Sequence, residues 1–214
     1  MSGLERRIVP AREMRVVEQG DGKPRKIVGY AAVFDSLSVE LWGFRERVAR
    51  GAFADSLAAG DDVRALWNHD PNIVLGRTKS GTLRLSEDET GLYVEIEPPD
   101  TQQGNDLVAV IARGDVDQMS FSFRVIEDKW SIDESEQYVR TLVQVKLYDV
   151  APATFPAYPD TSLGVRSAGP HPFYGEIPVI PAEAQRALAS AAAGDEVRAH
   201  LAALRRRLEI VEIE

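Results

Sequence analysis

The chain has 214 residues, enough for one full domain and a tail, and its 44% hydrophobic and 28% charged residues are typical of a folded globular protein. The formal net charge of −9 argues against a nucleic-acid-binding protein, because such a protein needs a basic face to neutralise phosphates. The chain has no cysteine, which excludes disulfides, thiolate catalysis and cysteine-bound zinc.

Residues 1–15 mix charged and apolar side chains and lack the apolar stretch of a signal peptide. No apolar run approaches the roughly 20 residues that are needed to cross a bilayer. We therefore expect no membrane partner, and the absence of disulfides suits a reducing cytoplasm.

Residues 1–165 are predicted to form a strand-rich α+β unit. Its first half should contain strands at 27–34 and 44–48 and a short helix within 51–60, bracketed by two glycines. A further strand is expected at 63–69, with its alternate side chains on one side.

The second half of this unit is predicted to contain four strands and one helix. The strands span 81–85, 91–97, 119–126 and 138–150. The helix spans 106–113, with Gly114 as its C-cap. The acidic stretch 127–137 is expected to be an exposed connection between two of the strands.

The C-terminal part differs in composition. Residues 166–181 are rich in proline and glycine and are predicted to be a linker, and residues 182–214 are predicted to be a helical tail. Four apolar residues in the tail repeat at helical spacing: Val197, Leu201, Leu204 and Leu208. Such a stripe is suited to packing against a partner or against the same chain.

His69 is the histidine within the predicted folded unit, whereas His171 lies in the linker and His200 on the tail. By alternation it ends the strand 63–69 on the side of apolar neighbours, and Pro71 is expected to end that element. A half-buried histidine can have a pKa suited to general-base work. The alternative is a structural histidine whose hydrogen bonds are made to the backbone.

Residues 119–123 read Met-Ser-Phe-Ser-Phe, and alternation places Ser120 and Ser122 on the face opposite the methionine and both phenylalanines. A serine becomes a nucleophile only where a base takes its proton, so it must lie within reach of a histidine. The alternative is an amphipathic strand with a polar outer face.

By alternation Asp149 shares a face of the predicted strand 138–150 with Val143, Val145 and Leu147, at the edge of a predicted buried face. A buried carboxylate requires hydrogen bonds or a positive partner, and His69 is a candidate for that partner. The alternative is an aspartate that caps the turn beginning at Ala151. Triads are defined by geometry and not by chain order, so the spacing of these residues does not establish one.

Short segments between residues 27 and 165 together resemble the prohead protease family of tailed bacteriophages. The clearest are Gly-Tyr-Ala-Ala-Val-Phe at 29–34, Trp-Asn-His-Asp at 67–70, Met-Ser-Phe-Ser-Phe at 119–123 and Val-Ala-Pro-Ala-Thr-Phe-Pro-Ala-Tyr at 150–158. Shorter matches occur at 50–53, 75–77, 81–83, 91–92 and 113–116. Each segment is short, and it is the ordered set that is specific to the family.

The resemblance implies a serine endopeptidase with a fold similar to herpesvirus assemblin, a mainly antiparallel β-barrel flanked by helices. It implies that His69 of the Asn-His-Asp motif is the base and that Ser120 is the nucleophile. Assemblin uses a second histidine as third member, but none lies near the matching strand here, and Asp149 is the candidate. Two positions depart from the family pattern: the usual glycine is Ser122, and the usual small polar residue after the valine is Ala151.

The resemblance also implies the setting of the activity: inside the assembling prohead in the host cytoplasm. The implied substrates are scaffold protein, the scaffolding segment of the major capsid protein and the protease itself. No cofactor or metal is expected, since the chain lacks His-Glu-x-x-His, and a homodimer is left open.

Two other classes of protein are alternatives to this one. An aspartic protease is disfavoured because Asp-Thr-Ser at 160–162 lacks the glycine of Asp-Thr-Gly and has no second copy. A non-catalytic virion assembly or scaffold protein that retains the protease fold is the remaining alternative. It predicts that Ser120, His69 and Asp149 do not converge.

Overall fold

The computed structural model describes residues 3–10, 12–18, 20, 25–41, 43–154, 178–187 and 189–190. The strands are β1 (Glu5–Pro10), β2 (Arg12–Val17), β3 (Lys26–Val33), β4 (Phe44–Val48), β5 (Arg64–Trp67), β6 (Asp70–Arg77), β7 (Leu83–Glu87), β8 (Gly91–Ile96), β9 (Gln118–Ile132) and β10 (Tyr138–Ala153). The helices are α1 (Ala54–Ala58), the 3-10 turn η1 (Thr78–Ser80) and α2 (Gln102–Arg113), and residues 182–187 and 189–190 are helical. No helix in these ranges is long and apolar enough to cross a membrane.

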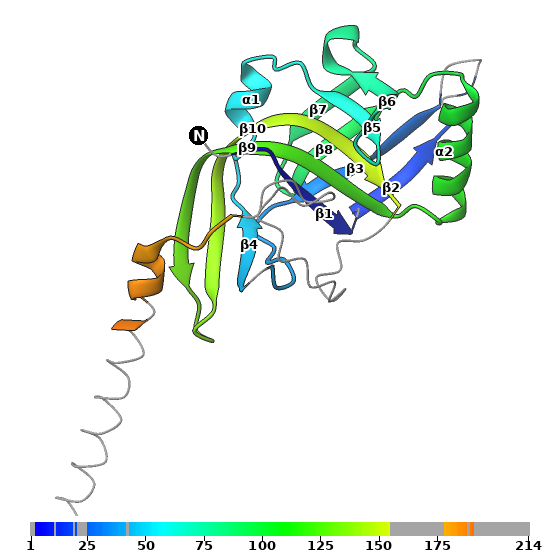
Figure 1. Cartoon of the computed structure of the whole chain (residues 1–214). Helices are drawn as coiled ribbons and strands as arrows, with labels where there is room; N and C mark the ends of the chain where they lie inside the picture. The colour runs from blue at the N-terminus through cyan, green and yellow to red at the C-terminus, as the bar shows by residue number, and fades with distance from the viewer. Residues whose placement is uncertain are drawn as a thin grey trace, which may run out of the picture.

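The strands form two sheets (Figure 1). The six-stranded sheet has the order β1-β9-β10-β5-β6, with β4 paired to β10, and the four-stranded sheet has the order β2-β3-β8-β7. Strand β10 is parallel to β4 and β5, and the other ladders are antiparallel. The strand-rich α+β class is therefore as predicted.

The closed, mainly antiparallel barrel is not seen in the described part of the chain. The six-stranded sheet ends at β1 and β6 and the four-stranded sheet at β2 and β7, so the ladders have open ends. The two sheets are joined where Phe34, directly after β3, forms an isolated bridge with Val48 of β4. An isolated bridge joins the sheets at one corner and does not close them.

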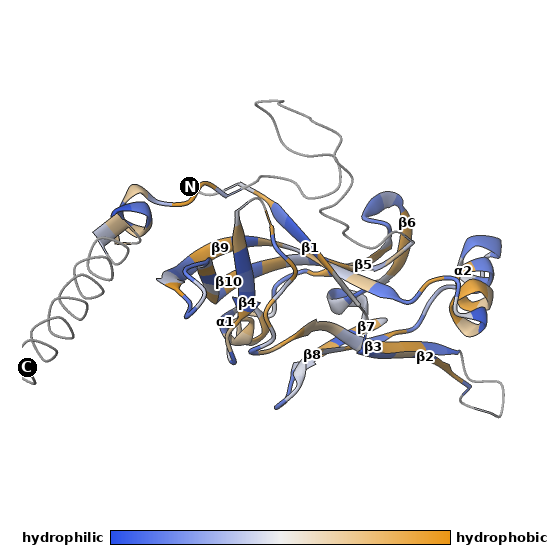
Figure 2. Ribbon diagram, turned by 90° about the horizontal axis from the view of Figure 1, so that it is seen from below, coloured by the Kyte–Doolittle hydropathy of each residue, from blue (hydrophilic) through white to orange (hydrophobic). Residues whose placement is uncertain are grey.

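The core lies between the two sheets and draws apolar residues from both. Met119, Phe121 and Phe123 point into it and are at most 1% exposed, as the alternation of β9 predicted. The ring centroid of Phe121 lies 5.1 Å from that of Phe123, whose ring is stacked on it. It lies 5.5 Å from the ring centroid of Phe53, on the loop before α1, in an edge-on arrangement. Figure 2 shows the alternation of hydrophobic and hydrophilic residues along the strands.

Several predicted elements are confirmed with small changes in their bounds. The helix predicted at 106–113 is α2, which begins four residues earlier because the Thr101 side chain accepts a hydrogen bond from the backbone N–H of Gly104. It ends at Gly114, whose φ of 84° is the left-handed C-cap conformation. The short helix within 51–60 is α1, and the hairpin predicted near 81–97 is formed by β7 and β8.

The prediction that 127–137 only connects two strands was wrong for its first half, although most of these residues are exposed as predicted. Strand β9 continues to Ile132 and pairs there with Tyr138 of β10. The paired ends of β9 and β10 form a two-stranded ribbon. On one face of this ribbon, Asp128 accepts a hydrogen bond from Arg140, and the Arg140 guanidinium lies over the ring of Trp130. Glu127, Lys129 and Ser131 alternate with Asp128 and Trp130 and are exposed, so a charged sequence can still form a strand.

The linker and the tail are only partly covered by the described residues. Residues 155–177 and 191–214 lie outside them, and with them His171, His200 and the apolar stripe predicted at 197–208. The described stretch 182–187 is helical, and the helical tail at 182–214 stays a prediction.

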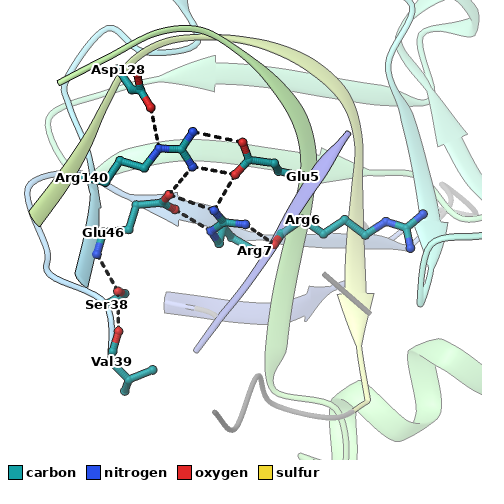
Figure 3. Close-up of polar contacts among 8 residues, drawn as sticks. All are labelled: Glu5, Arg6, Arg7, Ser38, Val39, Glu46, Asp128 and Arg140. Atoms are coloured by element: carbon teal, nitrogen blue, oxygen red, sulfur yellow. Dashed lines mark hydrogen bonds and ion pairs between the residues drawn. The ribbon is translucent and has the colours of Figure 1, made fainter. Parts of the chain in front are cut away.

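A buried ion cluster fastens the N-terminal strand to the rest of the sheet (Figure 3). Arg7 donates to Glu46 at 2.6 Å and to Glu5 at 2.7 Å, and Arg140 donates to Glu5 at 2.7 Å and to Glu46 at 3.1 Å. All four side chains are at most 7% exposed. Burial alone would lower the pKa of Arg140, but the hydrogen bonds and charges of the two glutamates outweigh it, and that pKa is raised.

We expect Arg140→Met to destabilise the protein by about 3–5 kcal/mol, because Glu5 and Glu46 would keep buried charges with one partner fewer. Urea unfolding at pH 7 measures this loss. Arg113→Met is the matched control, since Arg113 is 74% exposed and its ion pair with Asp115 contributes little. Equal destabilisation by the two variants would show that the cluster does not hold β1 in place.

Candidate active site

His69 lies in a tight turn and not at the end of a strand. Strand β5 ends at Trp67, which pairs with Asp70 of β6, so Asn68 and His69 form a two-residue hairpin loop. Both have positive φ, 54° for Asn68 and 59° for His69, as a type I′ turn requires at its two central positions. A histidine with this backbone is strained by roughly 1–3 kcal/mol, and such strain is typical of functional sites.

The prediction that a strand runs to His69 and stops at Pro71 was therefore wrong. The chain reverses at Asn68, and Pro71 lies inside the next strand, β6. A proline is tolerated there because β6 is at the edge of the sheet, where one side of the strand needs no ladder hydrogen bonds.

Asn68 ties the turn to the end of β10. Its backbone N–H donates to the carbonyl oxygen of Pro152 at 3.0 Å. Its side-chain amide donates to Thr154 Oγ1 at 3.0 Å and accepts from the Thr154 backbone N–H at 2.9 Å. No role was predicted for Asn68 or Thr154, although both belong to segments that carry the family resemblance.

The base of the same hairpin is held by an ion pair. Arg77 donates from Nε to Asp62 Oδ1 at 2.7 Å and from Nη2 to Asp62 Oδ2 at 2.5 Å. The hydrogen bonds from Arg77, with the charges of Arg64 and Lys79, lower the pKa of Asp62 to about 2. These two parallel hydrogen bonds fix the position of β6, the strand that follows His69.

The lowered pKa of Asp62 predicts a pH dependence of stability. A carboxylate with a depressed folded-state pKa stabilises the fold above its ordinary value of 3.8, and this contribution is lost as the pH falls towards 2. Asp62→Asn should therefore unfold at lower urea concentration than the wild type at pH 7, and the difference should narrow between pH 4 and pH 2. A difference that stays constant over this range would contradict the ion pair.

Ser120 and Ser122 lie on the face of β9 opposite the phenylalanines, as predicted, but this face is not an outer one. Both serines are fully buried. Strand β1 pairs with β9 beside them, with Ile8 opposite Ser120 and Arg6 opposite Ser122. The alternative of an amphipathic strand with a polar face in solvent does not describe this position.

A β-bulge brings Asp149 to the serine face. Leu147 pairs with Phe123, but Asp149 pairs with Ser122, so Tyr148 is an extra residue in β10. Such a bulge reverses the alternation of side chains after it. The prediction that Asp149 shares the face of Leu147 was therefore wrong, because without the bulge the carboxylate would lie on the phenylalanine side.

The three candidate residues meet at one point. Ser120 Oγ lies 2.5 Å from His69 Nε2, and Asp149 Oδ1 lies 2.5 Å from His69 Nδ1. The side chains of His69 and Asp149 are 6% and 13% exposed. Because a carboxylate accepts, Nδ1 carries the proton, and Nε2 is left free to accept from the Ser120 hydroxyl. This arrangement of hydroxyl, imidazole and carboxylate can transfer a proton from serine to histidine.

Other chemistry has less support in the described residues. Within the described ranges, no group of three or more histidine, aspartate or glutamate side chains is arranged to hold a metal ion. Ser122 is a further polar side chain at the site, with Oγ 3.1 Å from His69 Nδ1.

The comparison with protein families agrees with this geometry. The sequence pattern of the caudovirus prohead serine proteases matches residues 11–171. The chain belongs to this family. The predicted family resemblance is thereby confirmed, whereas the relation to herpesvirus assemblin stays a prediction.

Two individual phage proteases are similar to this chain. The prohead protease of Enterobacteria phage HK97 is 30% identical to this chain over 148 residues. The match covers 68% of this chain and 61% of the relative, so the chain spans about three fifths of that protein's length. The capsid assembly protease of bacteriophage T4 is similar to 72% of this chain and 98% of its own, with 11% identity and a TM-score of 0.48.

Proposed function

We propose that this chain is a serine endopeptidase with Ser120 as nucleophile, His69 as general base and Asp149 as orienting carboxylate. The observation that carries the proposal is the pair of contacts on one imidazole: the Ser120 hydroxyl at Nε2 and the Asp149 carboxylate at Nδ1. Membership of the prohead serine protease family supports the same reaction class.

The proposed reaction is acyl transfer. Ser120 Oγ attacks the scissile carbonyl carbon while His69 Nε2 takes the hydroxyl proton. Asp149 holds the ring in this tautomer and stabilises the imidazolium that forms. His69 then gives the proton to the leaving amine, and water hydrolyses the acyl-enzyme with the same base.

The proposed substrates are proteins of the phage head: the scaffold, the scaffolding segment of the major capsid protein and the protease itself. The proposed place of action is the assembling prohead in the host cytoplasm. The proposed organisation is a protease domain at 1–165, a linker at 166–181 and a helical tail at 182–214. We also propose that the two sheets correspond to the barrel of assemblin, since one core draws side chains from both.

A non-catalytic assembly protein with the same fold remains the second candidate. The departures at Ser122 and Ala151 are what favours it. It requires that Ser120, His69 and Asp149 do not converge, and the hydrogen-bonding distances between them argue against it.

Co-expression with the cognate capsid and scaffold proteins tests the proposal. The purified shells are analysed by intact mass, which reports every trimmed chain and the cleaved bond. We expect capsid or scaffold protein to lose a defined segment. If all partners and the protease itself stay uncut in assembled shells, the assembly-protein alternative takes the place of this proposal.

A further inference from the structure

The site contains a second hydroxyl that the proposed reaction does not use. Ser122 is fully buried and stands opposite Asp149 in the β9–β10 ladder. Its Oγ lies 3.1 Å from His69 Nδ1 and accepts a hydrogen bond from Arg6 Nε at 3.2 Å. A buried hydroxyl with two such contacts has a defined orientation.

The Arg6 contact determines what Ser122 can do. A guanidinium has donors and no acceptor, so Ser122 Oγ must present a lone pair to Arg6 Nε. His69 Nδ1 carries the proton that it donates to Asp149, so this nitrogen too is a donor towards the serine oxygen. Ser122 Oγ therefore accepts from both sides, and the protonated His69 Nδ1 cannot act as its base.

We infer that Ser122 is a positioning residue for His69 and that Arg6 of β1 holds Ser122 in place. The change in reaction rate that this inference predicts rests on the proposed function. Two acceptors on one nitrogen, Asp149 at 2.5 Å and Ser122 at 3.1 Å, restrain the ring against rotation and keep Nε2 directed at Ser120. The N-terminal strand thereby becomes part of the support of the site.

Strand β1 is suited to this role. Its side chains alternate between the two faces: Glu5 and Arg7 enter the buried ion cluster, and Arg6 points away from that cluster (Figure 3). The cluster fixes the strand, and the strand presents Arg6 beside Ser122, its partner in the β1–β9 ladder.

Reaction with a fluorophosphonate measures the kinetic consequence. In this reaction Ser120 Oγ forms a bond to phosphorus, His69 takes the proton and fluoride leaves. Loss of one neutral hydrogen bond at the ring is expected to lower the maximal rate about threefold to tenfold in Ser122→Ala and Ser122→Gly. The half-saturating concentration should not change, because Ser122 contacts His69 at Nδ1, whereas the reacting Ser120 hydroxyl lies at Nε2.

A double-mutant cycle tests the link to Arg6. Arg6→Met should slow the reaction to a similar degree, and Arg6→Met combined with Ser122→Ala should be no slower than Ser122→Ala alone. Arg15→Met on β2, the next strand along the chain, is the control, since Arg15 is 57% exposed and pairs with Glu13. Additive losses would show that Arg6 does not act through Ser122.

The downfield proton NMR signal of His69 Nδ1–H provides a readout that does not depend on activity. His69→Gln assigns the signal by removing it, and thermal melting verifies that each variant is folded. We expect the signal to shift and broaden in Ser122→Ala, as the ring moves more freely. An unchanged signal together with wild-type kinetics would overturn the inference while leaving the proposed function intact.

The remaining outcomes separate the inference from the function. If Ser122→Ala removes all labelling and Ser120→Ala keeps it, Ser122 is the nucleophile and the inference is wrong. If the wild type itself is not labelled, the proposed function fails, and the NMR signal of Ser122→Ala still decides whether Ser122 restrains the ring.

Discussion

Ser120→Ala is expected to lower the rate of peptide cleavage by a factor on the order of 10⁵, because no other group can take over its part in the reaction. Ser120 Oγ is the hydroxyl that faces His69 Nε2, the nitrogen that can accept a proton. Cleavage of the cognate capsid protein, followed by mass spectrometry over time, measures the loss. The alanine is smaller by one oxygen and should leave the buried strand folded.

Ser122→Ala is the matched control for this prediction, since it makes the same change two residues along the same face of β9. Its rate should fall about threefold to tenfold, the size expected for one hydrogen bond to the histidine. A Ser120→Ala protein that cleaves within tenfold of the wild type would mean that the nucleophile has been misassigned.

Asp149→Asn should lower the rate by about 10⁴-fold although the side chain keeps its shape. An amide that turns its NH₂ group towards His69 Nδ1 donates a hydrogen bond there, so the ring proton moves to Nε2. Nε2 then carries a proton and cannot accept the one from Ser120. The measurement is again the cleavage rate, with circular dichroism to verify the fold.

Asp115→Asn serves as the control for that variant, because Asp115 is exposed and pairs with Arg113 on the surface. Its rate should equal that of the wild type. If Asp149→Asn also keeps a rate within tenfold of the wild type, Asp149 does not orient His69, and the third member of the triad would have to be sought elsewhere.

The parts of the fold that local patterns govern could be predicted from the sequence. Alternation in 119–123 separated the serines from Met119, Phe121 and Phe123, and the structure buries those three in the core. Helix α2 could be predicted from its apolar spacing and from Gly114, because its end depends on a conformation that glycine adopts easily.

The parts that depend on distant pairing could not be predicted. Strand β1 reads as a mixture of charged and apolar residues, and its Glu5 and Arg7 are buried only because Glu46 and Arg140 meet them. The cluster joins residues more than a hundred positions apart, so no local window contains it.

The geometry of the site was missed for the same reason. The turn at Asn68 and His69 has no glycine to indicate positive φ, and it is held by Pro152 and Thr154 from the end of β10. The bulge at Tyr148 is defined only against the register of β9. The residue types of the candidate triad could be chosen from the sequence, but the two backbone irregularities that bring them together could not.

The central claim is that His69 activates Ser120, and the site of covalent labelling tests it most directly. The full chain is treated with a fluorophosphonate, digested and mapped by mass spectrometry, beside His69→Gln as the variant that lacks the base. The account predicts one adduct, on Ser120, in the wild type and none at the same reagent concentration in the variant. An adduct on Ser122, or equal labelling of Ser120 with and without His69, would contradict it.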